Sequence, residues 1–162
     1  MITHNKFILA SSSNSRFKIL KNAGLNFTTA KPTCNEEKIK RKLKRKKYNP
    51  SLIAKKLSYE KAKSVSLHKK NKARIVFGCD TLIYLNNRIF DKAKNLKEAK
   101  KKILKLSGKK HKIVSGLTAF RSGKKIWQCS DTTEVEIRTL TSQQVDVYLK
   151  KTGKQILGSV GC

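Results

Sequence analysis

Apolar residues recur along this 162-residue chain with the periods of strands and helices, so we expect the chain to fold. The strongest strand signal is the continuous apolar run at 73–80, ARIVFGCD, which is typical of a buried strand. The clearest helix signal covers 95–108, where apolar residues lie at helical spacing between Asn95, a capping residue, and Gly108, a stop signal. The rest of the first half predicts strands at 7–10 and 25–29, helices at 15–23 and 50–68, and a solvated helix or a mobile segment at 36–50.

The second half of the chain predicts two hairpins and a last helix. Asn86 and Asn87 form a favoured two-residue turn for the first hairpin, and the sequence SGK supplies the turn of the second. The predicted elements are a hairpin at 81–90, strands at 111–121 and 125–138, a helix at 141–153, and a strand or turn that begins in the final residues, QILGSVGC. This order predicts one α/β domain over residues 1–162, with a mixed, twisted β-sheet flanked by helices.

The formal net charge of +29 raises the question of a polyanionic partner. Of the 39 basic residues, 32 are lysines and seven are arginines, and they are spread along nearly the whole chain, with one dense run, KIKRKLKRKK. Proteins that read bases favour arginine for its bidentate geometry. A lysine-rich proteome therefore explains the charge better than specific nucleic-acid binding. A strongly positive field still attracts polyanions, nucleotides included.

Other classes of protein are disfavoured. No stretch approaches the length of a membrane-spanning helix, and the N-terminus lacks the long apolar region of a signal peptide, so we expect a cytoplasmic protein. The four cysteines lack zinc-ligand spacing and are expected to be reduced. His111 is expected in a turn or at the surface, and Trp127 is expected to pack in the core or on the sheet.

Two stretches carry candidate chemistry. The turn LASSSNSR at 9–16 joins a strand to a helix, where serine can cap the helix and where backbone N–H groups can hold an anion such as phosphate. Asp80 is predicted to end the strand at 73–80, a position where carboxylates commonly line ligand sites. It could hold a divalent metal or orient a water molecule. The alternative is an aspartate that only caps the turn after the strand.

Two acids and two lysines are weaker candidates. Glu36 and Glu37 are the only acids in the first 59 residues, and they lie at a predicted helix start, where the helix dipole favours acids with or without a function. Lys61 and Lys92 could each bind phosphate as a point charge. Among 32 lysines, however, neither stands out from an ordinary solvated side chain.

Seven motifs together resemble one family. The chain is similar over essentially its whole length to the Maf-like nucleoside triphosphate pyrophosphatases, and its GCDT, FDK and LGSVG forms resemble the alphaproteobacterial branch. The motifs, in the order and spacing of the family, are ILASSSNSRFKILKNAGLNF, NEE, LSYEKAKSV, VFGCDTLI, RIFDKAKNLKEAKKKILKLSGKKHKIVSGL, TTEVEIRTLTSQQVDVYLKKTG and LGSVG.

The resemblance implies a hydrolase of nucleotide-pool house-cleaning. Such enzymes hydrolyse a nucleoside triphosphate, in some cases a non-canonical or modified one, to the monophosphate and pyrophosphate with a divalent metal, Mg²⁺ or Mn²⁺. By resemblance, Asp80 is the catalytic proton acceptor, and Glu36 and Asp80 hold the metal. The positions that match substrate-binding residues are Ser11, Ser13, Ser15, Arg16, Lys61, Thr81 and Lys92.

The chain departs from the family pattern in several places. Ser15 stands where the family often has arginine, and Asn35 stands where it has aspartate. Ser15 and Thr81 match positions that select the base, and only Thr81 has the form of the pyrimidine-type branch. Family members continue past GSVG into a further strand and helix. The resemblance therefore implies a chain that lacks the last strand and helix of the fold.

Two functions of other classes stay open. A basic nucleic-acid-binding module would show salt-steep binding without metal-dependent turnover, although the sequence contains no RRM, KH or aromatic-basic stacking pattern. An inactive, truncated remnant would neither fold fully nor turn over. The sequence does not decide the preferred base or whether the chain forms a homodimer.

Overall fold

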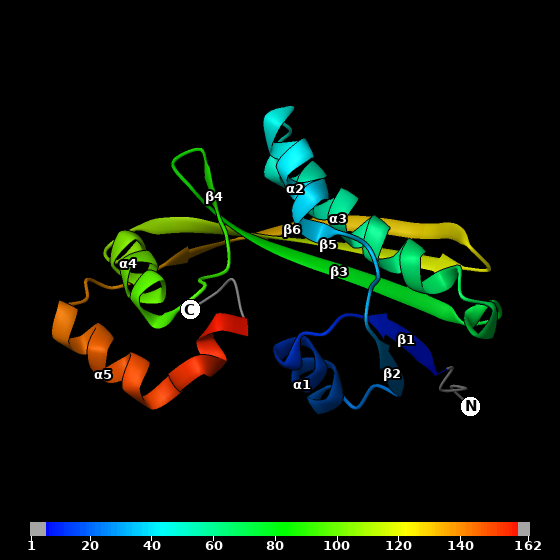
Figure 1. The fold of residues 1–162 in the computed structure, drawn as a ribbon, viewed down its shortest axis with the longest axis horizontal. Helices are drawn as coiled ribbons and strands as arrows, with labels where there is room; N and C mark the ends of the chain where they lie inside the picture. Colours follow the sequence, from blue (N-terminus) through cyan, green and yellow to red (C-terminus); the bar gives the residue numbers. More distant parts are fainter. Residues whose placement is uncertain (1–5, 159–162) are drawn as a thin grey trace. The chain divides into compact units, whose positions relative to one another are not determined.

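The computed structural model describes residues 6–158, which form an α/β fold with a mixed sheet, as the sequence predicts. The strand order is β2-β1-β3-β5-β6, with β4 paired to β3. β1 is parallel to β2 and β3, and β4 is antiparallel to β3. The elements labelled in Figure 1, together with two short 3₁₀ helices, are β1 (Phe7–Ala10), α1 (Asn14–Asn22), β2 (Phe27–Ala30), α2 (Glu36–Arg45), α3 (Pro50–Ser66), η1 (Lys69–Asn71), β3 (Ile75–Leu85), β4 (Arg88–Phe90), α4 (Leu96–Leu106), β5 (Lys110–Arg121), β6 (Lys124–Glu136), α5 (Ser142–Thr152) and η2 (Gly153–Gly158).

Contacts divide the chain into two compact units. The first takes in the described part of residues 1–80 together with 115–131, and the second takes in 81–114 with the described part of 132–162. The long strands β3, β5 and β6 contribute residues to both units. The single domain expected from the sequence stays a prediction.

In the first unit, one face of the sheet is aromatic and is covered by α1. The pairing of Leu9 with Phe77 places the odd-numbered side chains of β1 and β3 on this face. Phe7 stacks on Phe27 of β2 with 5.4 Å between ring centroids and meets the edge of Phe77. Phe17 of α1 lies edge-on against Phe27, so α1 packs here.

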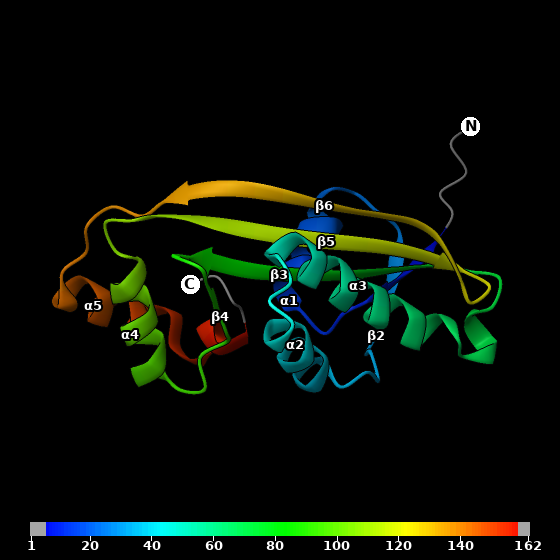
Figure 2. The same cartoon turned by 90° about the horizontal axis from the view of Figure 1, so that it is seen from above.

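Helix α3 covers the opposite face of the same unit, and Figure 2 shows it lying along the strands. Gly78 allows this approach, because a Cβ at that position would overlap the carbonyl oxygen of Ser58 and would lie 2.6 Å from the Ala62 nitrogen. Even-numbered side chains of β1 and β3 therefore face α3. The core cluster on this side consists of Ile8, Ala10, Ala62, Val65, Val76 and Phe120.

The second unit is built around packed helices. Thr141 starts α5 with a capping box, in which its hydroxyl accepts from the Gln144 N–H and the Gln144 side chain accepts from the Thr141 N–H. Asn86 and Asn87 adopt φ values of 47° and 60° and form the turn between β3 and β4, which confirms the predicted hairpin turn. The shared core of α4, α5 and η2 consists of Ala99, Ile103, Val145, Leu149 and Ile156.

Several segments differ from their sequence-based predictions. β3 runs unbroken from Ile75 to Leu85, so Asp80 lies inside a strand and not at its end. The strand continues because Leu82 and Ile83 are buried and its last residues pair with β4. The open choice at 36–50 resolves into helix α2. Residues 153–158 form a 3₁₀ helix and no strand, because Ile156 packs into the helical core; residues 159–162 lie outside the described part.

Two single residues differ from what the sequence favoured. Trp127 lies on strand β6, as predicted, but it is not in the core: it is 48% exposed, because β6 is the end strand of the sheet, where its neighbour Ile126 is 54% exposed as well. His111 is buried, because it is the second residue of β5, a strand with a neighbour on each side. In both cases the burial of the side chain depends on the strand order, which the sequence does not reveal.

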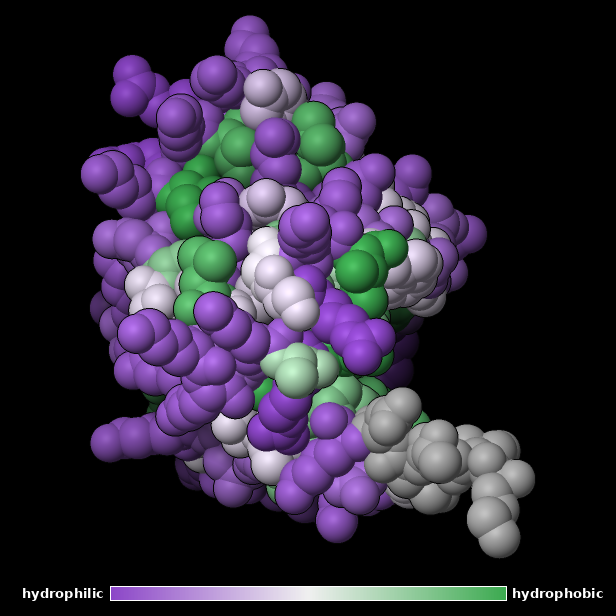
Figure 3. All heavy atoms as spheres, turned by 90° about the vertical axis from the view of Figure 1, so that its right-hand side faces the viewer, coloured by the Kyte–Doolittle hydropathy of each residue, from purple (hydrophilic) through white to green (hydrophobic). Residues whose placement is uncertain are grey.

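The surface reflects the charged composition. The face drawn in Figure 3 is mostly hydrophilic, and its hydrophobic residues form small separate patches. No helix among residues 6–158 has the length and apolar character needed to cross a membrane.

Candidate active site

The course of the chain around β1 and β3 singles out one edge of the first unit. From β1 the chain passes through α1 to β2 on one side, and it returns through α3 to β3 on the other side of β1. In open α/β sheets, ligands bind outside the carboxyl ends of strands at such a reversal. β1 ends at Ala10, opposite Gly78. Ser11 follows β1 directly, and Asp80 lies two residues beyond Gly78 on β3.

Three charged side chains meet at this edge. The side-chain nitrogen of Lys61 on α3 lies 2.6 Å from Oδ1 of Asp80 and 2.8 Å from Oε2 of Glu36 on α2. Lys61 and Asp80 are buried, with 5% and 8% of their surface exposed, whereas the Glu36 side chain is 47% exposed. We call these three residues the Lys61 cluster. It holds a buried cation between two carboxylates from separate elements.

The two carboxylates decide the charge state of Lys61. Burial lowers the pKa of its ammonium group, but the charges of Asp80 and Glu36, and hydrogen bonds to both, outweigh burial and raise the pKa above its usual value of 10.5. Lys61 is therefore a fixed positive charge at neutral pH.

Local sequence explains how Glu36 reaches the cluster. Asn35 caps α2, its side-chain oxygen accepting from the Lys38 N–H at 2.9 Å. Glu36 is the first residue of the helix, where the positive end of the helix dipole favours a carboxylate. Asn35, where this chain departs from the family pattern, thus caps the helix that carries Glu36.

The serine-rich turn forms its own hydrogen-bonded loop at the end of β1. Ser13 caps α1, accepting from the Arg16 N–H at 3.4 Å. The Ser11 hydroxyl accepts from the Ser13 N–H at 3.1 Å and from Nη1 of Arg16 at 3.3 Å. Ser11 is buried, and Arg16 is half-buried. The predicted phosphate-side residues Ser11, Ser13 and Arg16 therefore do come together, at a helix N-terminus.

Cys79 was not singled out from the sequence, yet it belongs beside this turn. Its odd position in β3 puts its side chain on the face that α1 covers, whereas Asp80 faces α3. Burial raises the pKa of the Cys79 thiol, and the charge of Arg16 together with a hydrogen bond from it acts in the opposite direction. The two neighbours Cys79 and Asp80 thus mark the two sides of one strand.

The three remaining predicted residues, Ser15, Thr81 and Lys92, are not members of the Lys61 cluster. Ser15 is an exposed residue in the first turn of α1. Thr81 follows Asp80 but belongs to the second unit, where it is half-buried. Lys92 is exposed in the connection between β4 and α4 and lines a hollow of about 270 Å³ in the second unit. Their roles toward a substrate stay predictions.

The donor set can be tested for a divalent cation. Among residues 6–158, no three or more His, Cys, Asp or Glu residues come together in a way that could hold a metal ion. Lys61 uses Oδ1 of Asp80 and Oε2 of Glu36, so it leaves the second oxygen of each carboxylate unused. One or two carboxylates are the usual protein share of a Mg²⁺ site, whose other ligands are water and substrate phosphates. The pair therefore fits a cation that binds together with a phosphorylated substrate.

Sequence reasoning missed two features that shape the site. It treated Lys61 only as a substrate lysine, whereas Lys61 bonds to both predicted metal-binding acids. It did not use Gly78, although a glycine inside a buried strand signals a close backbone approach. No sequence signal pointed to Cys79 as the neighbour of Arg16.

Comparison with known proteins gives a consistent set of relatives. Residues 6–162 match the family model described as Maf-like protein. A protein of Caulobacter vibrioides named nucleoside triphosphate pyrophosphatase is 35% identical over 154 residues, which cover 95% of this chain and 76% of that protein. A protein of Bartonella henselae named 7-methyl-GTP pyrophosphatase is 35% identical over 154 residues, with the same two coverages.

A solved structure gives a more distant match. A HAM1 protein from Coxiella burnetii superposes with a TM-score of 0.42 at 12% identity, over 81% of this chain and 72% of that chain. A likeness this distant carries no argument about the site.

Proposed function

Since this chain belongs to the Maf-like protein family, we propose that it is a nucleoside triphosphate pyrophosphatase, a hydrolase that cleaves a nucleoside triphosphate to the monophosphate and pyrophosphate. Relatives from Caulobacter and Bartonella agree with the alphaproteobacterial branch that the motifs resemble. The observation that carries the proposal is the Lys61 cluster, which unites two carboxylates and a lysine at family-matched positions on one edge of the sheet.

Cleavage of a phosphoanhydride needs charge neutralisation and a positioned water more than covalent chemistry. In our proposal, Ser11, Ser13 and the N–H groups at the start of α1 bind phosphate oxygens, and Arg16 neutralises their charge. Lys61 balances the charge of Asp80 and keeps that side chain in place. Asp80 accepts a proton from the attacking water, whose oxygen bonds to the α-phosphorus while the α–β phosphoanhydride bond breaks and pyrophosphate leaves.

A divalent cation, Mg²⁺ or Mn²⁺, would be held by Asp80 and Glu36. When bound, such a cation supplies further neutralisation of the phosphate charge. Lys61 and the cation would share the two carboxylates, each using different oxygens. By resemblance, Lys92 would bind the triphosphate as a point charge, and Ser15 and Thr81 would select the base. The nucleotide pool is in the cytoplasm, which is the location that this function favours.

The test is product analysis with a panel of nucleoside triphosphates, 7-methyl-GTP included, in the presence of Mn²⁺ or Mg²⁺. We expect the monophosphate and pyrophosphate to appear with the native protein and to disappear with Asp80→Asn and Glu36→Gln. Circular dichroism and thermal melting show whether these variants stay folded. Native-like turnover in a folded Asp80→Asn variant would overturn the assignment, as would the release of orthophosphate in place of pyrophosphate.

A further inference from the structure

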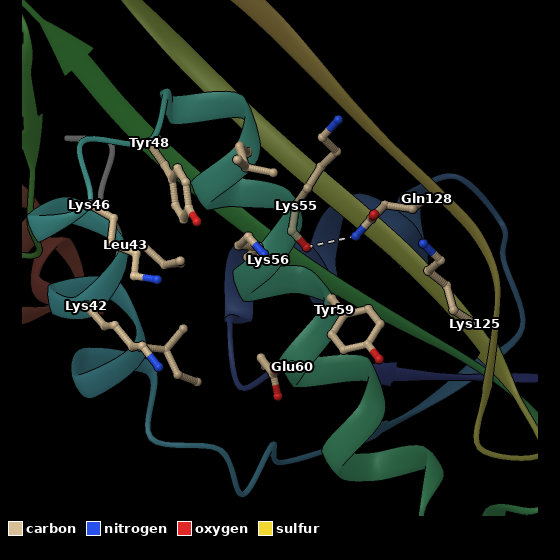
Figure 4. A pocket seen from close by; sticks show the side chains of 12 residues that line it. Lys42, Leu43, Lys46, Tyr48, Lys55, Lys56, Tyr59, Glu60, Lys125 and Gln128 are labelled. Carbon is tan, nitrogen blue, oxygen red and sulfur yellow. Dashed lines mark hydrogen bonds between the residues drawn. The ribbon is translucent and has the colours of Figure 1, made fainter.

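A second basic feature lies in the first unit, apart from the Lys61 cluster. A hollow of about 500 Å³ is lined by residues of α2, the α2–α3 connection, α3 and β6 (Figure 4). None of its lining residues belongs to the Lys61 cluster or to the serine-rich turn. Its volume suits a small ligand or one segment of a longer one. Five of the residues that line it are lysines, namely Lys42, Lys46, Lys55, Lys56 and Lys125.

The lysines of this hollow lack acidic partners. Within residues 6–158, no ion pair joins any of the five to a carboxylate, and Glu60 is the one acid among the lining residues. A few lysines elsewhere do pair, such as Lys100, which lies 2.7 Å from Asp146, and Lys61, which has two partners. The hollow thus gathers five lysines against one acid, Glu60, and this excess of positive charge attracts a polyanion.

Aromatic rings accompany this charge. Tyr59 lies edge-to-face with the buried Phe120 at 5.1 Å between ring centroids, which fixes its ring in place. The ammonium group of Lys56 lies 5.7 Å from the centroid of the Tyr48 ring. Aromatic rings beside lysines are the elements with which proteins bind single-stranded nucleic acid, since every base offers a face for stacking.

The charge also continues beyond the hollow. Lys38, Arg41 and Arg45 are exposed on α2, the helix that supplies Lys42 to the hollow. A mononucleotide could not use this extension, whereas a chain of phosphates could. The predominance of lysine over arginine fits contacts to phosphates and not to base edges.

From these observations we propose that the hollow between α2, α3 and β6 binds single-stranded nucleic acid without sequence preference. The five lysines contact successive phosphates, and a base stacks on the ring of Tyr48 or Tyr59. This inference goes beyond nucleotide hydrolysis and does not depend on it, because the two sites share no residue.

Fluorescence anisotropy with a labelled oligouridine of about a dozen nucleotides tests the proposal. Five phosphate contacts on a single strand predict that log K falls with log[KCl] with a slope of about −3.5. Replacing the five lysines by glutamine should weaken binding about tenfold or more at about 100 mM KCl and make the slope shallower. The matched control removes the same charge from exposed positions outside the hollow, by Lys→Gln at Lys69, Lys97, Lys109, Lys112 and Lys154.

The control should lose no more than about threefold in affinity. An equal loss in both variants would assign binding to the overall charge of the chain and overturn the proposal, as would the absence of binding by the native protein. Circular dichroism checks folding. If the variant with five replaced lysines does not fold, two double variants are compared with the native protein in its place, Lys42→Gln with Lys46→Gln and Lys55→Gln with Lys56→Gln.

Stacking is tested at the tyrosines. Changing Tyr48 and Tyr59 together to leucine should weaken oligouridine binding but not the binding of inorganic polyphosphate, whereas changing both to phenylalanine should leave both affinities unchanged. The proposal fails if the leucine variant binds oligouridine as tightly as the native protein does. It also fails if polyphosphate at the same phosphate concentration displaces oligouridine as well as unlabelled oligouridine does, because the hollow would then bind only the phosphates. Nucleotide turnover measured on the same variants keeps this outcome separate from that of the hydrolase.

Discussion

The side-chain nitrogen of Lys61 lies 2.6 Å from Oδ1 of Asp80, across the contact between helix α3 and strand β3. The bond depends on Gly78, because any side chain there would force the helix away from the strand. Packing and charge are therefore linked at this point. A substitution at Gly78 or in the Lys61–Asp80 pair should change both the stability and the turnover.

Removing the cation should destabilise the fold. Lys61→Met leaves Asp80 buried without its counter-charge, so we expect the free energy of unfolding to fall by about 3 kcal/mol. Urea denaturation at neutral pH measures this change. The double variant Lys61→Met with Asp80→Leu should regain most of the loss, because no buried charge is then left unpaired, and Glu36, the other partner of Lys61, is half-exposed to water. A single variant as stable as the native protein would contradict the importance of the pair.

Filling the space at Gly78 should affect stability and activity together. Gly78→Ala places a methyl group on the backbone of α3, which should cost about 1–3 kcal/mol and shift Lys61 away from Asp80, with a loss of turnover. Gly158→Ala is the control, since a Cβ there meets nothing within 4 Å. Unfolding curves and pyrophosphate release measure the two effects. Full turnover in Gly78→Ala would show that the cluster tolerates a displaced helix.

The stabilisation by Lys61 should depend on pH only in the alkaline range. Its pKa in the folded chain lies above the ordinary 10.5, so the charged form is favoured by folding. The stabilisation is fully present below that ordinary value and is lost as the pH rises through the folded pKa. The stability difference between the native protein and Lys61→Met should be constant from pH 7 to about 9 and shrink above about 10.5. A difference that shrinks already between pH 7 and 9 would point to another titrating group.

The thiol of Cys79 should react slowly, and Arg16 should be the reason that it is not slower still. Burial raises the pKa of this thiol, and Arg16 opposes the rise. Arg16→Gln should therefore reduce the rate of alkylation by iodoacetamide at pH 8 by a few-fold, measured by mass spectrometry, while Cys129 in the same sample serves as the reference. Faster alkylation of Cys79 would mean that Arg16 mainly shields it from solvent.

The serine cap should have a small and separable effect. Ser13→Ala removes the acceptor for the Arg16 N–H, a long bond of 3.4 Å, so we expect a loss of about 0.5–1 kcal/mol together with a higher KM for the nucleotide. Ser12→Ala, an exposed neighbour, should change neither quantity. A loss in stability without any change in KM would limit Ser13 to a capping role.

The sequence predicted the elements well where periodicity and caps agreed, as at α4 between Asn95 and Gly108. It predicted the end of β3 wrongly, because local pattern does not reveal that residues beyond Asp80 pair with β4. It singled out Asp80 from its place at a predicted strand end and Glu36 and Lys61 as weaker candidates, and the family resemblance then gave the three residues their expected roles. Lys61 bonds to Asp80 and Glu36 because α3 approaches the sheet closely at Gly78. The sequence pattern does not reveal the distance between this helix and the sheet.

Cys79 and Asp80 are adjacent in the chain, but their side chains lie on opposite faces of β3. The strand therefore separates two groups of side chains. Substitutions at Cys79 change the packing around Arg16 and the serines, while the packing around Lys61 on the other face is retained. Packing can be varied on one side at a time, whereas charge cannot, because Asp80 and Lys61 also act on the pKa of the Cys79 thiol.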